Sequence, residues 1–276
     1  MAVARSRSLV RSLTSRELQG RYRGSVFGFG WALVRPLVTL LVFALVVGQF
    51  LGASRLVPQF GIFLFVGLMP FSLFSAALSS GAAAITGNAP LVKKVRFPRE
   101  VLPLVVVNVA IVNTVIQIPI LLVGYFVTNS WPTPDRLILV LPASITLVVL
   151  SLACAVFLSA LNVFSRDVEH LMEVILLLLF WATPIVYPWT AAVEFFNSKG
   201  LHVLSQIYLD NPLTSSIIAF QNALWPGAQT TQGSAYILYD DIGSIPLWTA
   251  PLLSLVLLYF AHRFFVRVQG SFVRDL

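Results

Sequence analysis

The chain has 276 residues, of which 58% are hydrophobic and only 11% are charged, and its formal net charge is +7. A soluble domain carries about 25% charged residues, so this chain has too few to cover a water-soluble body of its size and is expected to be a membrane protein. The single cysteine, Cys154, excludes a disulfide scaffold and a cysteine-based zinc or iron–sulfur centre. Nucleic-acid binding explains the net charge poorly, because the basic residues lie beside apolar spans, and we expect neither a nucleic-acid partner nor a metal site.

The arginine-rich N-terminal segment is predicted to be a cytoplasmic amphipathic helix at the membrane interface. Leu9, Leu13 and Leu18 alternate with arginines at roughly helical spacing, which is typical of a helix lying on a leaflet. Such a helix is either a generic positive-inside anchor or a contact for a partner or a substrate head group. The planar fork of arginine suits phosphate oxygens, so Arg21 and Arg23, just ahead of the first span, are the candidate ligands of a pyrophosphate head group.

Long gaps between charged residues define the membrane spans, because a transmembrane helix needs about 20 mostly apolar residues. The gaps predict an all-α membrane protein with six transmembrane helices, near residues 31–51, 60–84, 102–128, 138–164, 170–188 and 246–264. An interface segment of residues 1–30 thus precedes one transmembrane domain of residues 31–276. Residues 189–245 are predicted to form an outer loop with surface helices, because the stretch after Asp210 is too polar for lipid.

The distribution of lysine and arginine predicts the orientation of the chain in the membrane. With a cytoplasmic N-terminus, fourteen of these residues lie inside and only Arg55, Arg136 and Lys199 lie outside, while Arg35 falls within the first span. The opposite orientation would invert this ratio. Both termini are therefore expected in the cytoplasm.

The loop of residues 85–100, after the second span, concentrates positive charge. Its four cations fall within seven positions, namely Lys93, Lys94, Arg96 and Arg99. The loop is predicted to form one or two helical turns pinned by Pro90 and Pro98. It is either only a positive-inside stop signal or a docking site for a cytoplasmic protein. Phe97 among the charges favours docking, because a solvated loop has no need of an aromatic ring.

The fifth span ends with the sequence LFWATPIVYPW, in which Pro184 and Pro188 lie one turn apart. A kink or break is expected there. Four aromatic residues cluster around the break, namely Phe180, Trp181, Tyr187 and Trp189. They form either an interfacial aromatic belt or a stacking surface along a translocation path, since flat apolar rings suit the faces of sugars.

The outer loop contains one clear helix start. Asn211 followed by Pro212 resembles an N-cap with proline at the first helical position. Apolar residues then fall on one face, namely Leu213, Ile217, Phe220 and Leu224. An amphipathic helix is therefore expected at the outer membrane surface, either as a lid over a pore or as a surface float.

The chain carries few signs of chemistry of its own. Asn113 and Gln117, one turn apart in the third span, are expected to form hydrogen bonds between helices. The spans hold too few acidic residues for an obvious proton relay. The sequence contains neither the P-loop pattern G-x-x-x-x-G-K-[ST] nor H-E-x-x-H. Catalysis by this chain alone is not expected.

Several stretches resemble the permeases of ABC-2 type polysaccharide exporters, which move O-antigen, teichoic acid and related lipid-linked glycans. The loop after the second helix of that family is matched by NAPLVKKVRFPREVLPL, and its fourth loop and fifth helix by SRDVEHLMEVILLLLFWATPIVYP. The start of its first helix is matched by RYRGSVFGFGWALVRPL and its outer segment by DNPLTSSIIAFQNAL, so the resemblance covers nearly the whole chain. One departure is Gln221, where a basic residue is expected, and it weakens any charge-based role for the outer helix.

This resemblance implies a homodimer of six-helix subunits in the plasma (inner) membrane of a bacterium, with two P-loop ATPase subunits on the cytoplasmic side. ATP and Mg²⁺ would bind to those subunits, and no cofactor would bind to this chain. The substrate would be a polyprenyl-pyrophosphate-linked glycan of the O-antigen, teichoic acid or cell-wall galactan type, entering from the cytoplasmic leaflet.

The resemblance also implies roles for particular residues. Residues 87–98 would form a coupling helix seated in a groove of the ATPase, and the coupling residues would be Asn88, Leu91, Lys93, Lys94, Arg96, Phe97 and Arg99. The glycan path would run between the two subunits along the aromatic residues Phe27, Trp31, Phe180, Trp181 and Tyr187. The outer gate after the fifth helix would contain Asn211, Pro212, Ile217 and Phe220.

Two other functions are compatible with these features. One is an ABC-2 permease for a drug or a small lipid, although the aromatic cluster at residues 180–189 and the loop motifs favour a glycan. The other is a non-transporting membrane scaffold that recruits a cytoplasmic enzyme, because the basic loop and the N-terminal arm suit a scaffold equally well. A scaffold would show no ATP-dependent flux after reconstitution.

Overall fold

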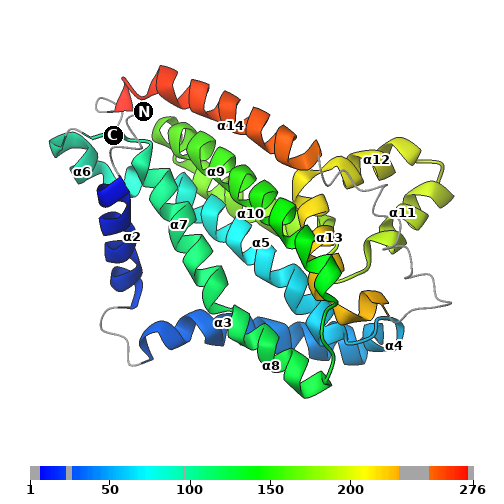
Figure 1. The fold of residues 1–276 in the computed structure, drawn as a ribbon. Coiled ribbons are helices and arrows are strands. Elements are labelled where there is room, and N and C mark those ends of the chain that lie inside the picture. Colours follow the sequence, from blue (N-terminus) through cyan, green and yellow to red (C-terminus); the bar gives the residue numbers. More distant parts are fainter. Residues whose placement is uncertain (1–6, 23–26, 96, 230–248, 273–276) are drawn as a thin grey trace.

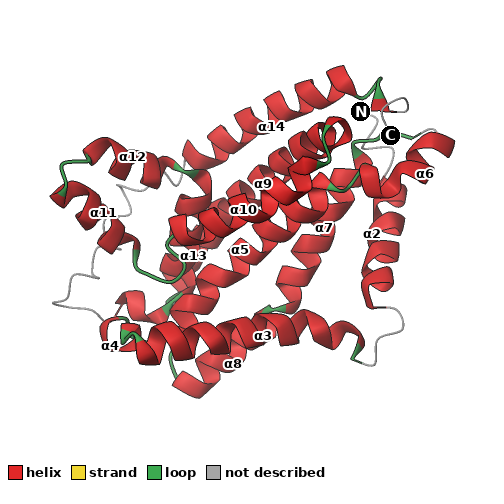
Figure 2. Ribbon diagram, turned by 180° about the vertical axis from the view of Figure 1, so that it is seen from behind, coloured by secondary structure: helices red, strands yellow, loops and turns green. Residues whose placement is uncertain are grey.

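A computed structural model of the chain describes residues 7–22, 27–95, 97–229 and 249–272. Within these ranges the regular structure is entirely helical, and no strand occurs (Figure 2). Long helices run side by side through the bundle. The helix α14 (Thr249–Val268) covers one side of it, and α3 (Trp31–Phe43) crosses the opposite side (Figure 1). This all-helical architecture agrees with the predicted fold class.

The centre of the bundle is formed by α5 (Phe60–Ala82) and α9 (Val140–Phe164), which pack directly against each other. Phe63, Leu64 and Val66 on α5 are fully buried, because the first half of this helix, from Phe60 to Phe71, is apolar around its circumference. Gly81 permits the close approach of the two backbones, since a Cβ atom at this position would lie 2.8 Å from that of Ala155. Around this pair pack three further helices, α7 (Val101–Ile116), α13 (Pro212–Leu224) and α14 (Thr249–Val268).

Five of the six predicted spans coincide with helices long and apolar enough to cross a membrane, which makes the chain a multi-pass membrane protein. These helices are Trp31–Phe50, Phe60–Ala82, Val101–Thr128, Pro134–Phe164 and Thr249–Val268. Three of them are composite: α3 (Trp31–Phe43) continues as the π-helix η2 (Ala44–Phe50), α7 continues as α8 (Ile118–Thr128), and the 3₁₀ turn η4 (Pro134–Leu139) leads into α9.

The fifth predicted span is shorter than expected. Its helix, α10 (Asp167–Ala182), has 16 residues, which corresponds to a length of about 24 Å, whereas the hydrocarbon core is about 30 Å thick. The helix ends because Thr183 adopts an extended conformation, as the residue before a proline usually does. The predicted break before Pro184 is therefore confirmed, and it removes the last six residues of the predicted span.

The outer segment after α10 forms three helices, of which two lie at the surface as predicted. The side chains of Val203 and Ile207 are 73% and 59% exposed. The two surface helices are α11 (Trp189–Ser198) and α12 (His202–Asp210).

The expectation that the helix after Asn211 also lies at the outer surface is wrong. Every residue of α13 from Pro212 to Ala223 is buried, and the helix packs between α5 and α9. Its polar side chains tolerate burial because they bond to the backbone: Ser216 Oγ donates to the Pro212 carbonyl oxygen (2.7 Å). α13 thus fills the half of the bundle away from α6, beyond the point where α10 ends (Figure 1).

The N-terminal helix, α2 (Arg7–Tyr22), packs along α7. Leu9, Leu13 and Leu18 are half-buried, while Arg7 and Arg11 are exposed, so the predicted amphipathic face is confirmed. The beginning of α2 lies at the same end of the bundle as the short helix α6 (Ala89–Lys94) and the last turns of α14 (Figure 1). The opposite end carries α4 (Ala53–Leu56) and the end of α8.

Candidate functional site

The basic loop forms a short helical projection at the end of the bundle where α2 begins. The 3₁₀ turn η3 (Thr86–Asn88) leads directly into α6, which has Pro90 in its first turn, so the predicted pair of helical turns is confirmed. Val92 is buried, whereas Lys93 and Lys94 are exposed. The projection is therefore held by its apolar side and presents its two lysines to the outside.

The other predicted coupling residues divide between the interior and this surface. Leu91 and Phe97 pack against a core cluster that includes Val92 and Phe265. Arg99 donates a hydrogen bond to the Gln269 carbonyl oxygen, and its guanidinium lies 5.8 Å from the ring centroid of Phe272. Arg99 thus attaches the loop to the end of α14.

The two remaining predicted coupling residues are Asn88 and Arg96. Asn88 is exposed, and its Nδ2 donates to the Ala84 carbonyl oxygen (2.9 Å). Arg96 lies outside the described residues. Among the described residues predicted for coupling, the outward positive charge therefore comes from Lys93 and Lys94.

A partly buried polar cluster, which was not predicted, joins the base of this projection to α9 and α10. Asn162 Nδ2 donates to Glu169 Oε1 (2.5 Å) and to Thr86 Oγ1 (3.1 Å). Thr86 Oγ1 lies 3.3 Å from the same carboxylate oxygen and donates to it. Because Thr86 lies in η3, Asn162 near the end of α9 and Glu169 in the first turn of α10, a displacement of the projection would act on α10 through these bonds.

The predicted path aromatics form two separate groups. Phe27 and Trp31 meet edge to face at 5.7 Å between ring centroids, at the start of α3. Phe180 and Trp181, at the end of α10, are 5.4 Å apart, and Tyr187 Oη donates to the Trp181 carbonyl oxygen (2.9 Å). Phe27, Trp31 and Trp181 are all at least half exposed.

Two further rings complete the second group and were missed from the sequence. Phe43 on α3 lies 5.3 Å from Phe180, and Phe71 on α5 lies 5.4 Å from the same ring. Neither residue stands out in its apolar span, because a phenylalanine in such a run has no local signature. Aromatic side chains from α3, α5 and α10 therefore meet where α10 ends.

The two arginines predicted to bind the head group lie at the end of α2 and just beyond it. Arg21 belongs to the last turn of α2, but its side chain is not among those described, and Arg23 lies outside the described residues.

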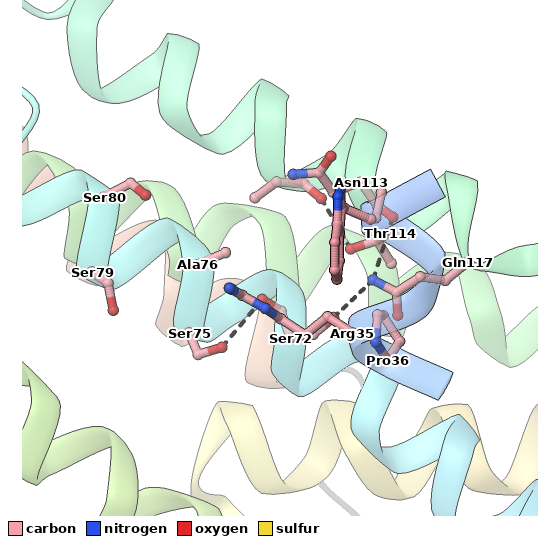
Figure 3. A pocket seen from close by; sticks show the side chains of 13 residues that line it. Arg35, Pro36, Ser72, Ser75, Ala76, Ser79, Ser80, Asn113, Thr114 and Gln117 are labelled. Atoms are coloured by element: carbon pink, nitrogen blue, oxygen red, sulfur yellow. Dashed lines mark hydrogen bonds between the residues drawn. The ribbon is translucent and has the colours of Figure 1, made fainter. Parts of the chain in front are cut away.

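A polar cavity lies between α3, α5 and α7 (Figure 3). Gln117 Nε2 donates to Ser72 Oγ on α5 (3.3 Å), which confirms the interhelical hydrogen bond predicted for Gln117. Asn113, Arg35 and Trp31 also line this cavity. No prediction had brought these residues together, because the sequence does not tell which helices are neighbours.

The outer helix α13 is fixed at both ends. Asn211 Oδ1 accepts from the Leu213 backbone N–H (3.0 Å), so the predicted N-cap is confirmed. Tyr125 Oη donates to the Leu224 carbonyl oxygen (2.6 Å), and Trp225 Nε1 donates to the Pro58 carbonyl oxygen (2.9 Å). The predicted gate residues Pro212, Ile217 and Phe220 are all buried.

Gln221, the departure from the family pattern, has a structural role. It is fully buried, and its Nε2 donates to the Pro184 carbonyl oxygen (2.7 Å). That carbonyl belongs to the break after α10 and has no place in a helix ladder. The amide of Gln221 therefore attaches α13 to the end of α10.

No group of three or more histidine, cysteine, aspartate or glutamate residues suited to a metal ion occurs within the described ranges.

The family model of ABC-2 type transporters matches residues 8–225.

Individual relatives extend this match. The O-antigen export system permease protein RfbA of Myxococcus xanthus is 33% identical over 244 residues, which are 88% of this chain and 90% of that protein. A protein of the same description from Klebsiella pneumoniae is 28% identical over 215 residues, 78% of this chain and 79% of the relative. The polysialic acid transport protein KpsM of Escherichia coli is 24% identical over 227 residues, with coverages of 79% and 81%. With the family model matching more than half of its length, the chain belongs to the ABC-2 type transporter family.

Proposed function

We propose that this chain is the membrane-spanning permease subunit of an ATP-driven exporter that moves a polyprenyl-pyrophosphate-linked polysaccharide across the membrane. The observation that carries the proposal is the exposed basic helix α6. It is held at its base by the buried Val92 and the half-buried Leu91, and the adjoining turn η3 is joined to α10 through Glu169. The named activities of the relatives, O-antigen export and polysialic acid transport, support a polysaccharide as the substrate.

The energy for transport comes from a separate subunit, because the sequence has no P-loop. We infer that two copies of a P-loop ATPase, each with ATP and Mg²⁺, bind two copies of this chain through α6. Lys93 and Lys94 suit an acidic rim on the ATPase, and the apolar contacts of Leu91 keep the helix in place while force is applied. No cofactor is assigned to this chain.

A homodimer is supported by the first span. Only 6% of this span is buried, against 78% of the second span, so α3 and η2 present a long apolar surface to lipid or to another subunit. The exposed side chains include Leu37, Val38, Leu41, Val42 and Phe50. We assign part of this surface to a second copy of the chain, with the glycan path between the two.

Six crossings with both termini cytoplasmic are supported by the course of the chain. α9 ends beside α6, whereas α14 begins at the opposite end of the bundle beside α13 (Figure 1). The intervening chain must therefore return along the bundle, and α10 does so as a fifth crossing. With the basic end inside, the protein lies in the inner membrane of a bacterium.

The glycan path is assigned to the aromatic groups of α3 and α10, in which Phe27, Trp31, Phe180, Trp181 and Tyr187 offer faces for stacking. Arg21 and Arg23 remain the predicted contacts for the pyrophosphate at its cytoplasmic start. At the outer end, we assign the moving part of the gate to the exposed helices α11 and α12. Asn211, Pro212, Ile217 and Phe220 form its fixed base, because they belong to the buried helix α13.

The proposal is tested by purifying the tagged chain in mild detergent and identifying its partners. A near-stoichiometric P-loop ATPase is expected, together with ATP-dependent movement of a lipid-linked glycan in proteoliposomes. Recovery of the chain alone, after crosslinking has excluded loss in detergent, would support a scaffold. ATP-dependent flux of a small lipid without flux of glycan would support the small-lipid permease.

A further inference from the structure

The cavity between α3, α5 and α7 has a volume of about 630 Å³ and is built from one face of each helix (Figure 3). Residues three, four and seven positions apart lie on one face of a helix, and the polar lining follows this spacing. The face of α5 carries serines, the face of α7 carries side-chain amides, and that of α3 carries one cation: Ser72, Ser75, Ser79, Asn113, Gln117 and Arg35.

This cavity lies at the depth of the middle of the spans and is open on the side of α3, where Trp31 and Arg35 are exposed. Ser72 lies near the middle of α5, and Gln117 stands at the junction of α7 and α8, in the middle of the third span. A second cavity, of about 360 Å³, shares Thr114 with the first but is lined almost entirely by apolar side chains such as Leu73 and Val148. Polar side chains at such a depth are costly in lipid and mark a substrate pathway, so the contrast singles out the first cavity.

Arg35 gives the cavity its charge. Its side chain lines the cavity together with Ser72 and Ser75 of α5 (Figure 3). No aspartate or glutamate lines the cavity, and within the described part of the chain no hydrogen bond or ion pair engages its guanidinium. A guanidinium without a carboxylate partner matches the paired oxygens of a phosphate.

The remaining lining suits a sugar. Serine hydroxyls both donate and accept hydrogen bonds, and side-chain amides do so through separate atoms. Gln117 uses its Nε2 on Ser72 and on the Asn113 carbonyl oxygen, which leaves its Oε1 as an acceptor. Trp31, half exposed at this cavity, adds a flat apolar ring for the face of a pyranose.

Taking the proposed function as its premise, we propose that this cavity binds the junction between the diphosphate and the first sugar of the lipid-linked substrate. The diphosphate pairs with Arg35, and the first sugar lies between Trp31 and the serine face of α5. Each subunit holds one such site.

Native mass spectrometry of the delipidated complex of this chain with its co-purified ATPase tests the assignment. The probes are a polyprenyl diphosphate carrying one hexosamine, the same polyprenyl diphosphate without sugar, and phosphatidylglycerol. Arg35→Gln should weaken binding of both diphosphates by about 10- to 100-fold, because hydrogen bonds to charged groups contribute about 1.5–3 kcal/mol. Arg55→Gln, which changes an exposed arginine outside the cavity, should leave binding unchanged.

Ser75→Leu tests the place of the sugar. A leucine side chain would occupy the cavity beside Arg35, so the probe with hexosamine should bind no better than the probe without it. Arg35→Lys keeps the charge but not the fork, and should retain part of the affinity.

Three results would overturn the assignment. The first is equal diphosphate binding by the parent and Arg35→Gln complexes. The second is an unchanged advantage of the hexosamine probe in Ser75→Leu. The third is phosphatidylglycerol binding that equals diphosphate binding and falls in proportion in Arg35→Gln, since the cavity would then hold a bulk lipid head group. Elution as an intact complex with the ATPase controls for folding.

These failures differ from failure of the proposed function. If cells export glycan only when the chain is present, but Arg35→Gln exports and binds like the parent, the exporter stands and the cavity assignment falls. If the chain binds no ATPase, the proposed function falls before any lipid is tested.

Discussion

Asn162 is a fully buried amide whose donor group is used twice, on Glu169 and on Thr86. Its Oδ1 is buried without a partner in the described structure, so the energy of this residue depends on its donor bonds. Removing the partner of a buried polar group exposes the full desolvation cost of that group, about 1–3 kcal/mol and more when a charge is involved. A carboxylate partner strengthens the bonds it accepts. Glu169 therefore matters both for stability and for the connection between η3 and α10.

Glu169→Ala should destabilise the protein by about 1–3 kcal/mol, because Asn162 and Thr86 both lose their charge-assisted hydrogen bond to the carboxylate. Glu169→Gln should lose less, since an amide oxygen can still accept from Asn162. Thermal unfolding followed by scanning fluorimetry in detergent measures the difference. Glu173→Ala, which alters an exposed residue one turn further along α10, is the matched control. Equal melting temperatures for Glu169→Ala and Glu173→Ala would contradict the structural role of the cluster.

At the scale of the element, α6 was predictable because its signals are local. Pro90 lies in its first turn, Pro98 follows its end, and its charges lie within a few residues. The N-cap at Asn211 and the break before Pro184 were predictable for the same reason. The sequence did not reveal that Arg99 faces Gln269 or that Glu169 joins η3, because both contacts depend on how distant helices pack.

The error about α13 has a specific cause. Ser215 and Ser216 contribute to the polarity that suggested a surface position for the stretch after Asp210. In the structure each hydroxyl donates to a carbonyl oxygen four residues earlier, so neither needs water. The expected amphipathic face, with Leu213 and Ile217, was correct as a pattern, but the opposite face packs too. The burial of α13 depends on the space that the short helix α10 leaves open, and this space cannot be predicted from the local sequence of α13. The cavity beside Arg35 escaped prediction for a related reason, since three helices each contribute one stripe.

Reversing charge on α6 should separate the ATPase from the permease without unfolding the permease. Lys93 and Lys94 are exposed, and surface substitutions usually change stability by no more than about 0.5 kcal/mol. Lys93→Glu with Lys94→Glu should therefore lower the amount of co-purified ATPase several-fold at unchanged melting temperature. Quantitative immunoblotting of both subunits measures this ratio. Lys199→Glu, at the opposite end of the protein, is the control, and equal ATPase recovery in the two variants would remove α6 from the interface.

In the whole molecule, aromatic rings from α3, α5 and α10 come together where α10 ends. If sugars stack along this group, Trp181→Ala with Tyr187→Ala should lower glycan export by about 5- to 100-fold while leaving the complex assembled. Stacking on an aromatic ring contributes about 0.5–1.5 kcal/mol per pair beyond burial, and two rings are removed. Export is measured as surface glycan per assembled complex. Trp131→Ala, at an aromatic pair outside this group, is the control. Normal export by the double variant would leave these rings with a packing or belt role.

The topology of the whole chain determines on which side each surface operates. In the described part of the chain, five spans are long enough to cross the bilayer. If only these five crossed, α6 and the end of α14 would lie on opposite sides. The two lie at one end of the bundle (Figure 1). The proposed topology therefore requires α10 to complete a sixth crossing despite its 16 residues, with the buried helix α13 filling the bundle beyond its end.

Cysteine labelling in intact cells tests this topology, and the chain suits the method because Cys154 is its single cysteine. In a Cys154→Ala background, Lys94→Cys and Lys199→Cys each introduce one exposed thiol at opposite ends of the bundle. A membrane-impermeant maleimide should label Lys199→Cys in intact spheroplasts, and Lys94→Cys only after permeabilisation. If neither position is labelled before permeabilisation, α10 does not cross; if both are labelled from outside, α10 does not cross and the orientation is inverted as well. Labelling of Lys94→Cys alone would invert the orientation and place the basic helix α6, and with it any ATPase contact, on the wrong side of the membrane.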